Sequence, residues 1–131
     1  MEQVLIIDDN QDLAVLLAET CTRDGLAAIS MTEGVAAVDL VRERAAAGSA
    51  PRVCLMDVAM PGLHGVKLMR ELKKVHGEIR IMAMTGFSGT ADLEEMRREG
   101  LVELFFKPFR TREVIAKIKF VLSSPPQGPQ P

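Results

Sequence analysis

The chain has 131 residues, of which 47% are hydrophobic and 26% are charged, so it fits one globular domain and is too short for a typical two-domain enzyme. Its 16 basic and 18 acidic residues leave a net charge of −2, which lacks the basic excess of a nucleic-acid-binding surface. No apolar run reaches the roughly 18 residues of a membrane span, and the N-terminus does not have the pattern of a signal peptide. Cys21 and Cys54 have no metal-binding spacing and indicate two buried thiols in a reducing compartment. We therefore expect a cytoplasmic domain that binds neither nucleic acid nor a membrane directly.

The first part of the chain predicts two strand–helix units. The apolar runs at residues 4–7 and 27–29 are typical of short strands. Between them, a helix is expected from Asn10 as its N-cap to Gly25 as its stop. Its apolar residues share one helical face: Leu13, Leu16, Leu17 and Cys21. A second helix is predicted by the stripe that Val35, Val38 and Val41 begin, and it ends before Gly48.

Three further units follow, with strands predicted at residues 53–56, 81–84 and 104–106. Helical stripes begin at Val66 and Val114. The helix between Thr90 and Gly100 is the weakest, because Leu93 and Met96 are its main large apolar residues, and we expect it to be held less firmly than its neighbours. Residues 123–131 contain four of the seven prolines and are predicted to be a disordered tail or the start of a linker.

Five strands that alternate with five helices predict an α/β fold of three layers. Several of the strand runs are apolar throughout, which is typical of parallel strands covered by helices on both faces. Ligands of open parallel sheets bind beyond the carboxyl ends of the strands. The polar residues that follow the strand runs are therefore expected to converge at one edge of the sheet: Asp8, Asp9, Asp57, Thr85 and Lys107.

This set of residues has a definite chemistry. Three close carboxylates repel one another, and a hard divalent cation such as Mg²⁺ relieves that repulsion because it prefers oxygen ligands. Lys107 supplies a positive charge for an anion, and Thr85 supplies a hydroxyl. A carboxylate is also a competent nucleophile toward phosphorus. The pattern therefore indicates an aspartate that accepts a phosphoryl group with the help of Mg²⁺.

With these motifs in place, the sequence resembles the receiver domain of two-component response regulators. The resemblance rests on IIDDNQ with Asp8 and Asp9, on CLMDVAMPGLHG with Asp57, on MAMTG with Thr85 and on the Lys107-Pro108-Phe109 run. It covers residues 1–122 as the receiver domain and implies a flavodoxin-like (βα)5 fold with strand order 2-1-3-4-5.

The resemblance also implies residue roles and partners. Asp57 would be the phosphoacceptor, and Thr85 and Lys107 would contact the phosphoryl oxygens. Asp9, Asp57 and the backbone carbonyl of Ala59 would bind Mg²⁺ directly, with Asp8 acting through water, and the Lys107–Pro108 peptide bond would be cis. The phosphodonor would be a sensor histidine kinase or a phosphotransfer protein. The changed surface, formed by the fourth helix, the fifth strand and the fifth helix, would bind an output partner or a fused output domain.

One departure from the family pattern concerns the switch. The family usually has Tyr or Phe three residues before the lysine, where this chain has Leu104, and we expect Phe87 to take over part of that aromatic role. The departure leaves room for a receiver-like docking module that works without phosphorylation. A Mg²⁺-dependent phosphohydrolase is a further alternative, although such enzymes usually carry an Asp-x-Asp pair where this chain has adjacent acids. The leading interpretation is a phosphoacceptor and not an enzyme.

Overall fold

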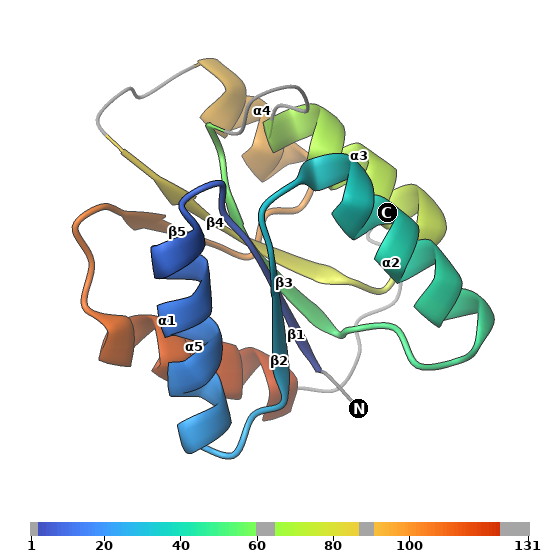
Figure 1. The fold of residues 1–131 in the computed structure, drawn as a ribbon. Coiled ribbons are helices and arrows are strands. Elements are labelled where there is room, and N and C mark those ends of the chain that lie inside the picture. The colour runs from blue at the N-terminus through green and yellow to red at the C-terminus, as the bar shows by residue number, and fades with distance from the viewer. Residues whose placement is uncertain (1–2, 60–64, 87–90, 124–131) are drawn as a thin grey trace.

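The computed structural model describes residues 3–59, 65–86 and 91–123 of the chain. Five strands and five helices alternate along it (Figure 1). The strands are β1 (Val4–Ile7), β2 (Ala28–Met31), β3 (Val53–Asp57), β4 (Arg80–Thr85) and β5 (Glu103–Phe106). The helices are α1 (Gln11–Arg23), α2 (Gly34–Ala46), α3 (Gly65–Val75), α4 (Ala91–Arg98) and α5 (Thr111–Ser123).

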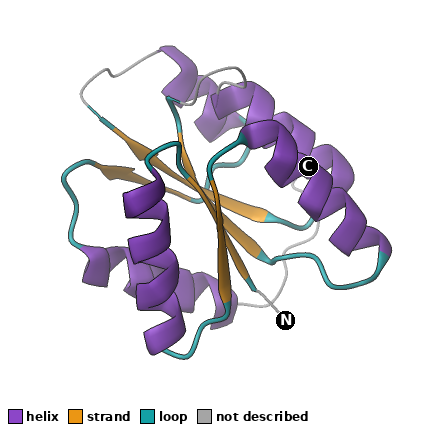
Figure 2. Cartoon of the chain, viewed as in Figure 1, coloured by secondary structure: helices purple, strands orange, loops and turns teal. Residues whose placement is uncertain are grey.

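The strands form one parallel sheet in the order β2-β1-β3-β4-β5. Helices cover both of its faces, with α1 and α5 on one side and α2, α3 and α4 on the other (Figure 2). This confirms the flavodoxin-like arrangement expected from the sequence. Successive side chains along a strand point to opposite faces of the sheet and enter two separate cores. In β1, Leu5 and Ile7 pack on the side of α2, α3 and α4, whereas Val4 and Ile6 pack on the side of α1 and α5.

The pairing register of the strands determines which residues lie at the carboxyl edge of the sheet. Ile7 of β1 is paired with Met56 of β3, and Thr85 of β4 with Phe106 of β5. Since all strands run in the same direction, the residues that end or follow β1, β3, β4 and β5 lie at one edge of the sheet. Asp57 and Thr85 are the last residues of their strands and do not follow them, so β3 and β4 each extend one residue further than the sequence indicated.

Other boundaries also differ by a residue or two. β2 is Ala28–Met31 and is shifted toward the C-terminus from the predicted 27–29, because its pairing with β1 includes Ser30 and Met31. The last helix includes Ser123, whose hydroxyl donates to the Phe120 carbonyl at 2.8 Å. The rest of the proline-rich segment, residues 124–131, lies outside the described residues.

Both cysteines are free and buried, as predicted. Burial and the nearby Asp24 charge raise the pKa of the Cys21 thiol to about 11, and burial raises that of Cys54 further. In the described part of the chain, no helix has both the length and the apolar character needed to cross a membrane.

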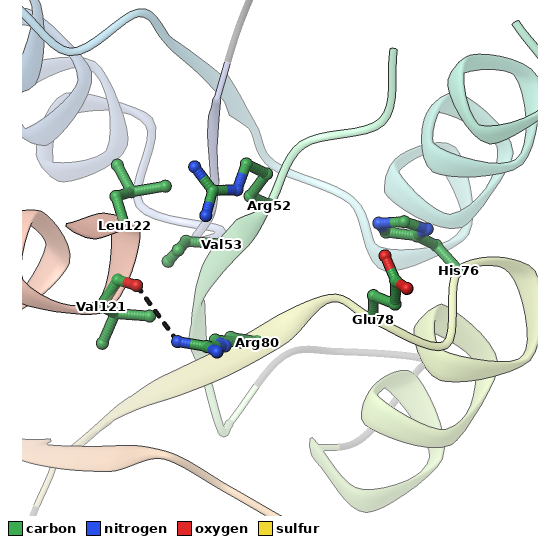
Figure 3. A pocket seen from close by; sticks show the side chains of 7 residues that line it. All are labelled: Arg52, Val53, His76, Glu78, Arg80, Val121 and Leu122. Atoms are coloured by element: carbon green, nitrogen blue, oxygen red, sulfur yellow. Dashed lines mark hydrogen bonds between the residues drawn. The ribbon is translucent and has the colours of Figure 1, made fainter. Parts of the chain in front are cut away.

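A cavity of about 40 Å³ opens at the amino ends of β3 and β4 (Figure 3). Val53 and Arg80 begin these two strands, and the Arg80 guanidinium donates a hydrogen bond of 3.1 Å to the Val121 carbonyl in the last turn of α5. The cavity has room for a few water molecules only. It lies at the edge of the sheet opposite to Asp57, away from the polar residues that the sequence singled out.

Candidate functional site

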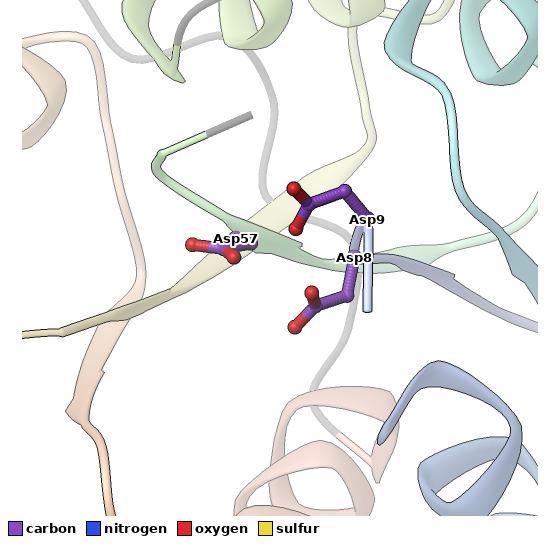
Figure 4. Close-up of side chains that lie close together, drawn as sticks. All are labelled: Asp8, Asp9 and Asp57. Atoms are coloured by element: carbon purple, nitrogen blue, oxygen red, sulfur yellow. The ribbon is translucent and has the colours of Figure 1, made fainter. Parts of the chain in front are cut away.

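Three carboxylates meet at the carboxyl edge of the sheet. Asp8 and Asp9 follow β1, and Asp57 ends the neighbouring β3. One carboxylate oxygen from each lies within 4.8 Å of the others, and the three groups point to the same side of the sheet edge (Figure 4). Asp8 is fully buried and Asp57 is 6% exposed, whereas Asp9 is exposed to solvent. The structure therefore brings together the three acids that the sequence singled out.

Backbone amides orient the two buried carboxylates. The Asn10 N–H donates to Asp8 Oδ1 at 2.9 Å, and the Ala59 N–H donates to Asp57 Oδ1 at 3.1 Å. Asn10 itself is held by α1, because its side-chain oxygen accepts the Leu13 N–H at 3.2 Å as an N-cap. The start of α1 thus positions the Asp8 carboxylate. The sequence identified Asn10 only as a helix cap. Its position directly after two acids could also have predicted the hydrogen bond from its N–H to Asp8.

Lys107 reaches both buried carboxylates. It follows β5, where its N–H donates to the Thr85 carbonyl at 2.7 Å. Its Nζ donates to Asp8 Oδ2 at 3.1 Å and to Asp57 Oδ2 at 3.2 Å. The next peptide bond, Lys107–Pro108, is cis. One ammonium group therefore bridges side chains that lie 99 and 50 positions away in the sequence.

The electrostatics of the site are those of an acidic pocket with one cation. Burial raises the pKa of Asp8, and the Asp57 charge adds to this, while the Asn10 N–H and Lys107 oppose it. Burial acts to lower the pKa of Lys107, but its hydrogen bond to Asp8 and the charges of Asp57 and Asp8 outweigh that effect and raise it overall. The cation compensates only part of the negative charge, which leaves the pocket suited to a second cation.

The donor set fits Mg²⁺. Carboxylate oxygens are the ligands that this ion prefers, and it usually keeps several waters while it is held by one or two carboxylates. Asp9 is open to solvent and Asp57 lies beside it, so water has access on one side. Ala59 is also exposed and is the last residue described before residue 65.

Two further residues that the sequence singled out, Thr85 and Leu104, lie on the neighbouring strands β4 and β5. Thr85 ends β4 and is 2% exposed, and its hydroxyl lies 3.5 Å from the Gly86 carbonyl oxygen. Leu104 is half-buried and packs against the core between the sheet and α2–α4. Phe87, expected from the sequence to share the aromatic role, lies outside the described residues. Phe106, which the sequence analysis did not single out, is paired with Thr85 and is 58% exposed.

The fold and the site together define a receiver-type domain. A family model for the response regulator receiver domain matches residues 4–119. The chain belongs to this family, whose members act in two-component signalling as phosphoacceptor domains and not as conventional enzymes. This confirms the resemblance seen in the sequence motifs.

Individual relatives agree with this assignment. The chain is 29% identical over 119 residues to sporulation initiation phosphotransferase F of Bacillus subtilis (strain 168), a match that covers 90% of this chain and 91% of the relative. Among solved structures, the non-phosphorylated HemR receiver domain of Leptospira biflexa has a TM-score of 0.83 at 20% identity and covers 98% of this chain and 99% of its own. The receiver domain of NtrX from Brucella abortus has a TM-score of 0.81 at 24% identity, with 93% and 99% covered. These two structural likenesses show the shared fold.

Proposed function

We propose that this chain is a phosphorylation-activated switch in which Asp57 accepts a phosphoryl group from a partner histidine kinase or phosphotransfer protein. The observation that carries the proposal is the convergence of three carboxylates and the Lys107 ammonium at one edge of the sheet. In this assignment the receiver domain extends to the end of α5 at Ser123, one residue beyond the boundary expected from the sequence, and the segment from residue 124 is a tail or linker. The domain acts in the cytoplasm and binds neither nucleic acid nor a membrane itself.

Asp57 is the proposed nucleophile because its carboxylate is held in place and lies close to the exposed Asp9. The Ala59 N–H and the Lys107 Nζ occupy one oxygen each, which fixes the direction of the group. In the reaction, a carboxylate oxygen forms a bond to phosphorus while the bond between phosphorus and the donor imidazole nitrogen breaks. Lys107 can then move its contact from the carboxylate to the phosphoryl oxygens, as can the Thr85 hydroxyl, which has only a long contact of 3.5 Å in the unmodified protein.

Mg²⁺ is the proposed cofactor. Asp9, Asp57 and the Ala59 carbonyl would hold it, with Asp8 linked through water. When bound, it neutralises the charge that accumulates on the carboxylates and on the transferring phosphoryl group. The protein's own part is to orient Asp8 and, through the Asn10 N–H and Lys107, to oppose the rise that burial causes in its pKa.

The proposed output is a change at the surface of α4, β5 and α5. A new contact from Thr85 to a charged group would contribute about 1.5–3 kcal/mol, whereas Lys107 would exchange its contact to Asp57 for one to the phosphoryl group. A shift from 1:99 to 99:1 between two states needs about 5.5 kcal/mol, so the Thr85 contact supplies part of it and the exchange at Lys107 must supply more. Because Leu104 has no ring, we assign the response to two apolar residues of β5: Leu104, which is paired with Ala83, and the exposed Phe106, which is paired with Thr85.

The test is a labelling experiment. Incubation with Mg²⁺ and a small phosphodonor, such as an acyl phosphate or a phosphoramidate, is expected to add one acid-labile phosphoryl group, seen as an intact-mass increase. Asp57→Asn is expected to abolish the label. Asp12→Asn, which removes an exposed acid from the first turn of α1, serves as the matched control and is expected to label normally.

Three results would contradict the proposal. Equal labelling of the Asp57→Asn protein would place the phosphoacceptor elsewhere. Absence of label in the unaltered protein, with partner binding that does not depend on Asp57, would favour the docking module that works without phosphorylation. Sustained turnover of phosphomonoesters would favour a phosphohydrolase.

A further inference from the structure

Arg70 of α3 pairs with two acids that the functional site does not use: Glu95 of α4 and Glu99, the residue directly after α4. Its Nε donates to Glu99 Oε1 at 2.7 Å, and its Nη2 donates to Glu95 Oε1, also at 2.7 Å. Glu95 and Glu99 are one helical turn apart, so they form a matched pair of acceptors for the fork of one guanidinium group. One turn further along α3, Lys73 Nζ donates to the Glu99 carbonyl at 3.0 Å. We call these contacts the α3–α4 clamp.

The clamp matters because α4 is short and few of its described side chains are buried in the core. It is eight residues long, and a helix of that length is not stable by itself in water. Met96 is its fully buried apolar side chain, and Leu93 is only partly buried. Three charge-assisted contacts to α3 are therefore a substantial share of what fixes the position of α4.

The position of α4 is in turn tied to the phosphorylation site by two routes. Met96 packs beneath the site, since a Cβ added at Gly65 would lie 3.0 Å from Met96 Sδ and 3.2 Å from Val58 Cγ1. Val58 directly follows Asp57, and its N–H donates to the Met84 carbonyl at 2.9 Å. The second route is the chain itself, because only residues 86–90 separate Thr85 from the first residue of α4.

We infer that Arg70 is a positioning residue for the phosphoryl site: by clamping α4 to α3 it stabilises the unphosphorylated arrangement around Thr85, so that loss of the clamp favours binding of a phosphoryl group. The inference rests on the proposed function and adds a regulatory residue to it. In the structure the clamp occurs together with a Thr85 hydroxyl that lies 3.5 Å from the Gly86 carbonyl oxygen. By linkage, an interaction that stabilises one arrangement around Thr85 weakens the binding of any ligand that requires a different arrangement.

The test uses beryllofluoride, a non-covalent phosphoryl mimic, so that an equilibrium affinity is measured. In the presence of Mg²⁺, Arg70→Gln is expected to bind beryllofluoride roughly three- to tenfold more tightly than the unaltered protein, the size expected when partly exposed ion pairs are lost. Arg70→Lys keeps the positive charge but loses the planar guanidinium that donates to two acids at once, and its beryllofluoride affinity is expected to change less. In a Thr85→Ala background, the effect of Arg70→Gln is expected to become smaller, since one of the two routes from α4 to the site runs through Thr85.

The matched control is Arg42→Gln. Arg42 also forms an exposed ion pair of 2.7 Å, but with Asp39 in its own helix α2, so its loss is expected to change neither the affinity nor α4. Hydrogen exchange supplies an independent measurement: the amides of α4 are expected to exchange faster in Arg70→Gln and not in Arg42→Gln.

The outcomes separate this inference from the proposed function. If the unaltered protein binds no beryllofluoride with Mg²⁺, the proposed function fails. If the unaltered protein binds it and Arg70→Gln binds it equally or more weakly, the inference alone is wrong. It is also wrong if α4 exchange is unchanged in Arg70→Gln, or if the gain in affinity is undiminished without the Thr85 hydroxyl.

Discussion

Replacement of Lys107 by methionine tests the electrostatic balance of the site. The substitution keeps the length and apolar stem of the side chain but removes the cation from between two buried carboxylates. Asp8 is fully buried and the Asp57 side chain is 8% exposed, so neither can be solvated freely once the ammonium is gone. We therefore expect Lys107→Met to destabilise the protein at pH 7 in the absence of Mg²⁺.

The magnitude follows from the geometry. Removal of one partner from a buried ion pair costs about 3–5 kcal/mol. The Lys107 side chain is 28% exposed, so solvent already screens part of its interaction, and we expect a loss of about 2–3 kcal/mol. For a domain of this size, such a loss lowers Tm by about 5–10 °C.

The assay is urea unfolding with and without Mg²⁺. If the ion binds the same carboxylates, it should replace part of the missing charge, so Mg²⁺ should stabilise Lys107→Met more than the unaltered protein. Lys119→Met is the control, because Lys119 pairs with Asp24 at 2.6 Å while both side chains are about half exposed at 48% and 50%, and its loss should cost less than about 1 kcal/mol. The reasoning is refuted if Lys107→Met is as stable as the unaltered protein without Mg²⁺, or if Mg²⁺ stabilises both equally.

Two further predictions concern the neighbours of this pocket. The pKa of Asp8 is raised in the folded protein, so its ionised form opposes folding. Asp8→Asn should therefore be more stable than the unaltered protein near pH 7 without Mg²⁺. This difference in stability should shrink as the pH falls through the raised pKa of Asp8 toward its ordinary value of 3.8. A constant difference in urea unfolding between pH 7 and pH 4 would contradict this. Gly65→Ala should cost about 1–3 kcal/mol by overpacking, since its Cβ would lie 3.0 Å from Met96 Sδ. Gly77→Ala, whose nearest neighbour would be the Lys73 carbonyl oxygen at 3.8 Å, should be nearly neutral, and equal stabilities of the two variants would show that Met96 and Val58 move aside at no cost.

Local sequence patterns accounted for most of the fold. Unbroken apolar runs such as Val4–Ile7 predicted buried parallel strands, and all four of its residues are fully buried. The Asn10 cap was also found as predicted. The boundaries of β3 and β4 were less accurate, because Asp57 and Thr85 are polar and look like loop residues in the sequence. Their backbones nevertheless belong to the sheet, where both side chains are buried at its edge.

Glu95 of α4 and Glu99 directly after it show where local patterns stop being informative. The sequence indicated only a weak helix between Thr90 and Gly100 and gave these two acids no partner. In the structure both glutamates pair with Arg70, which lies 25 and 29 positions earlier in the chain. Helical spacing shows that two acids share a face, but it does not show which helix packs against that face.

The amino-acid sequence by itself determined the alternation of strands and helices and the set of polar residues at the strand ends, because apolar periodicity and side-chain chemistry are properties of short segments. Only the tertiary structure decided that the Lys107 ammonium group donates hydrogen bonds to both Asp8 and Asp57, and that Arg70 of α3 pairs with Glu95 and Glu99. Such contacts depend on the register between neighbouring strands and on how helices pack across a face of the sheet. Distances of about 3 Å are set by that packing, which involves the whole domain at once.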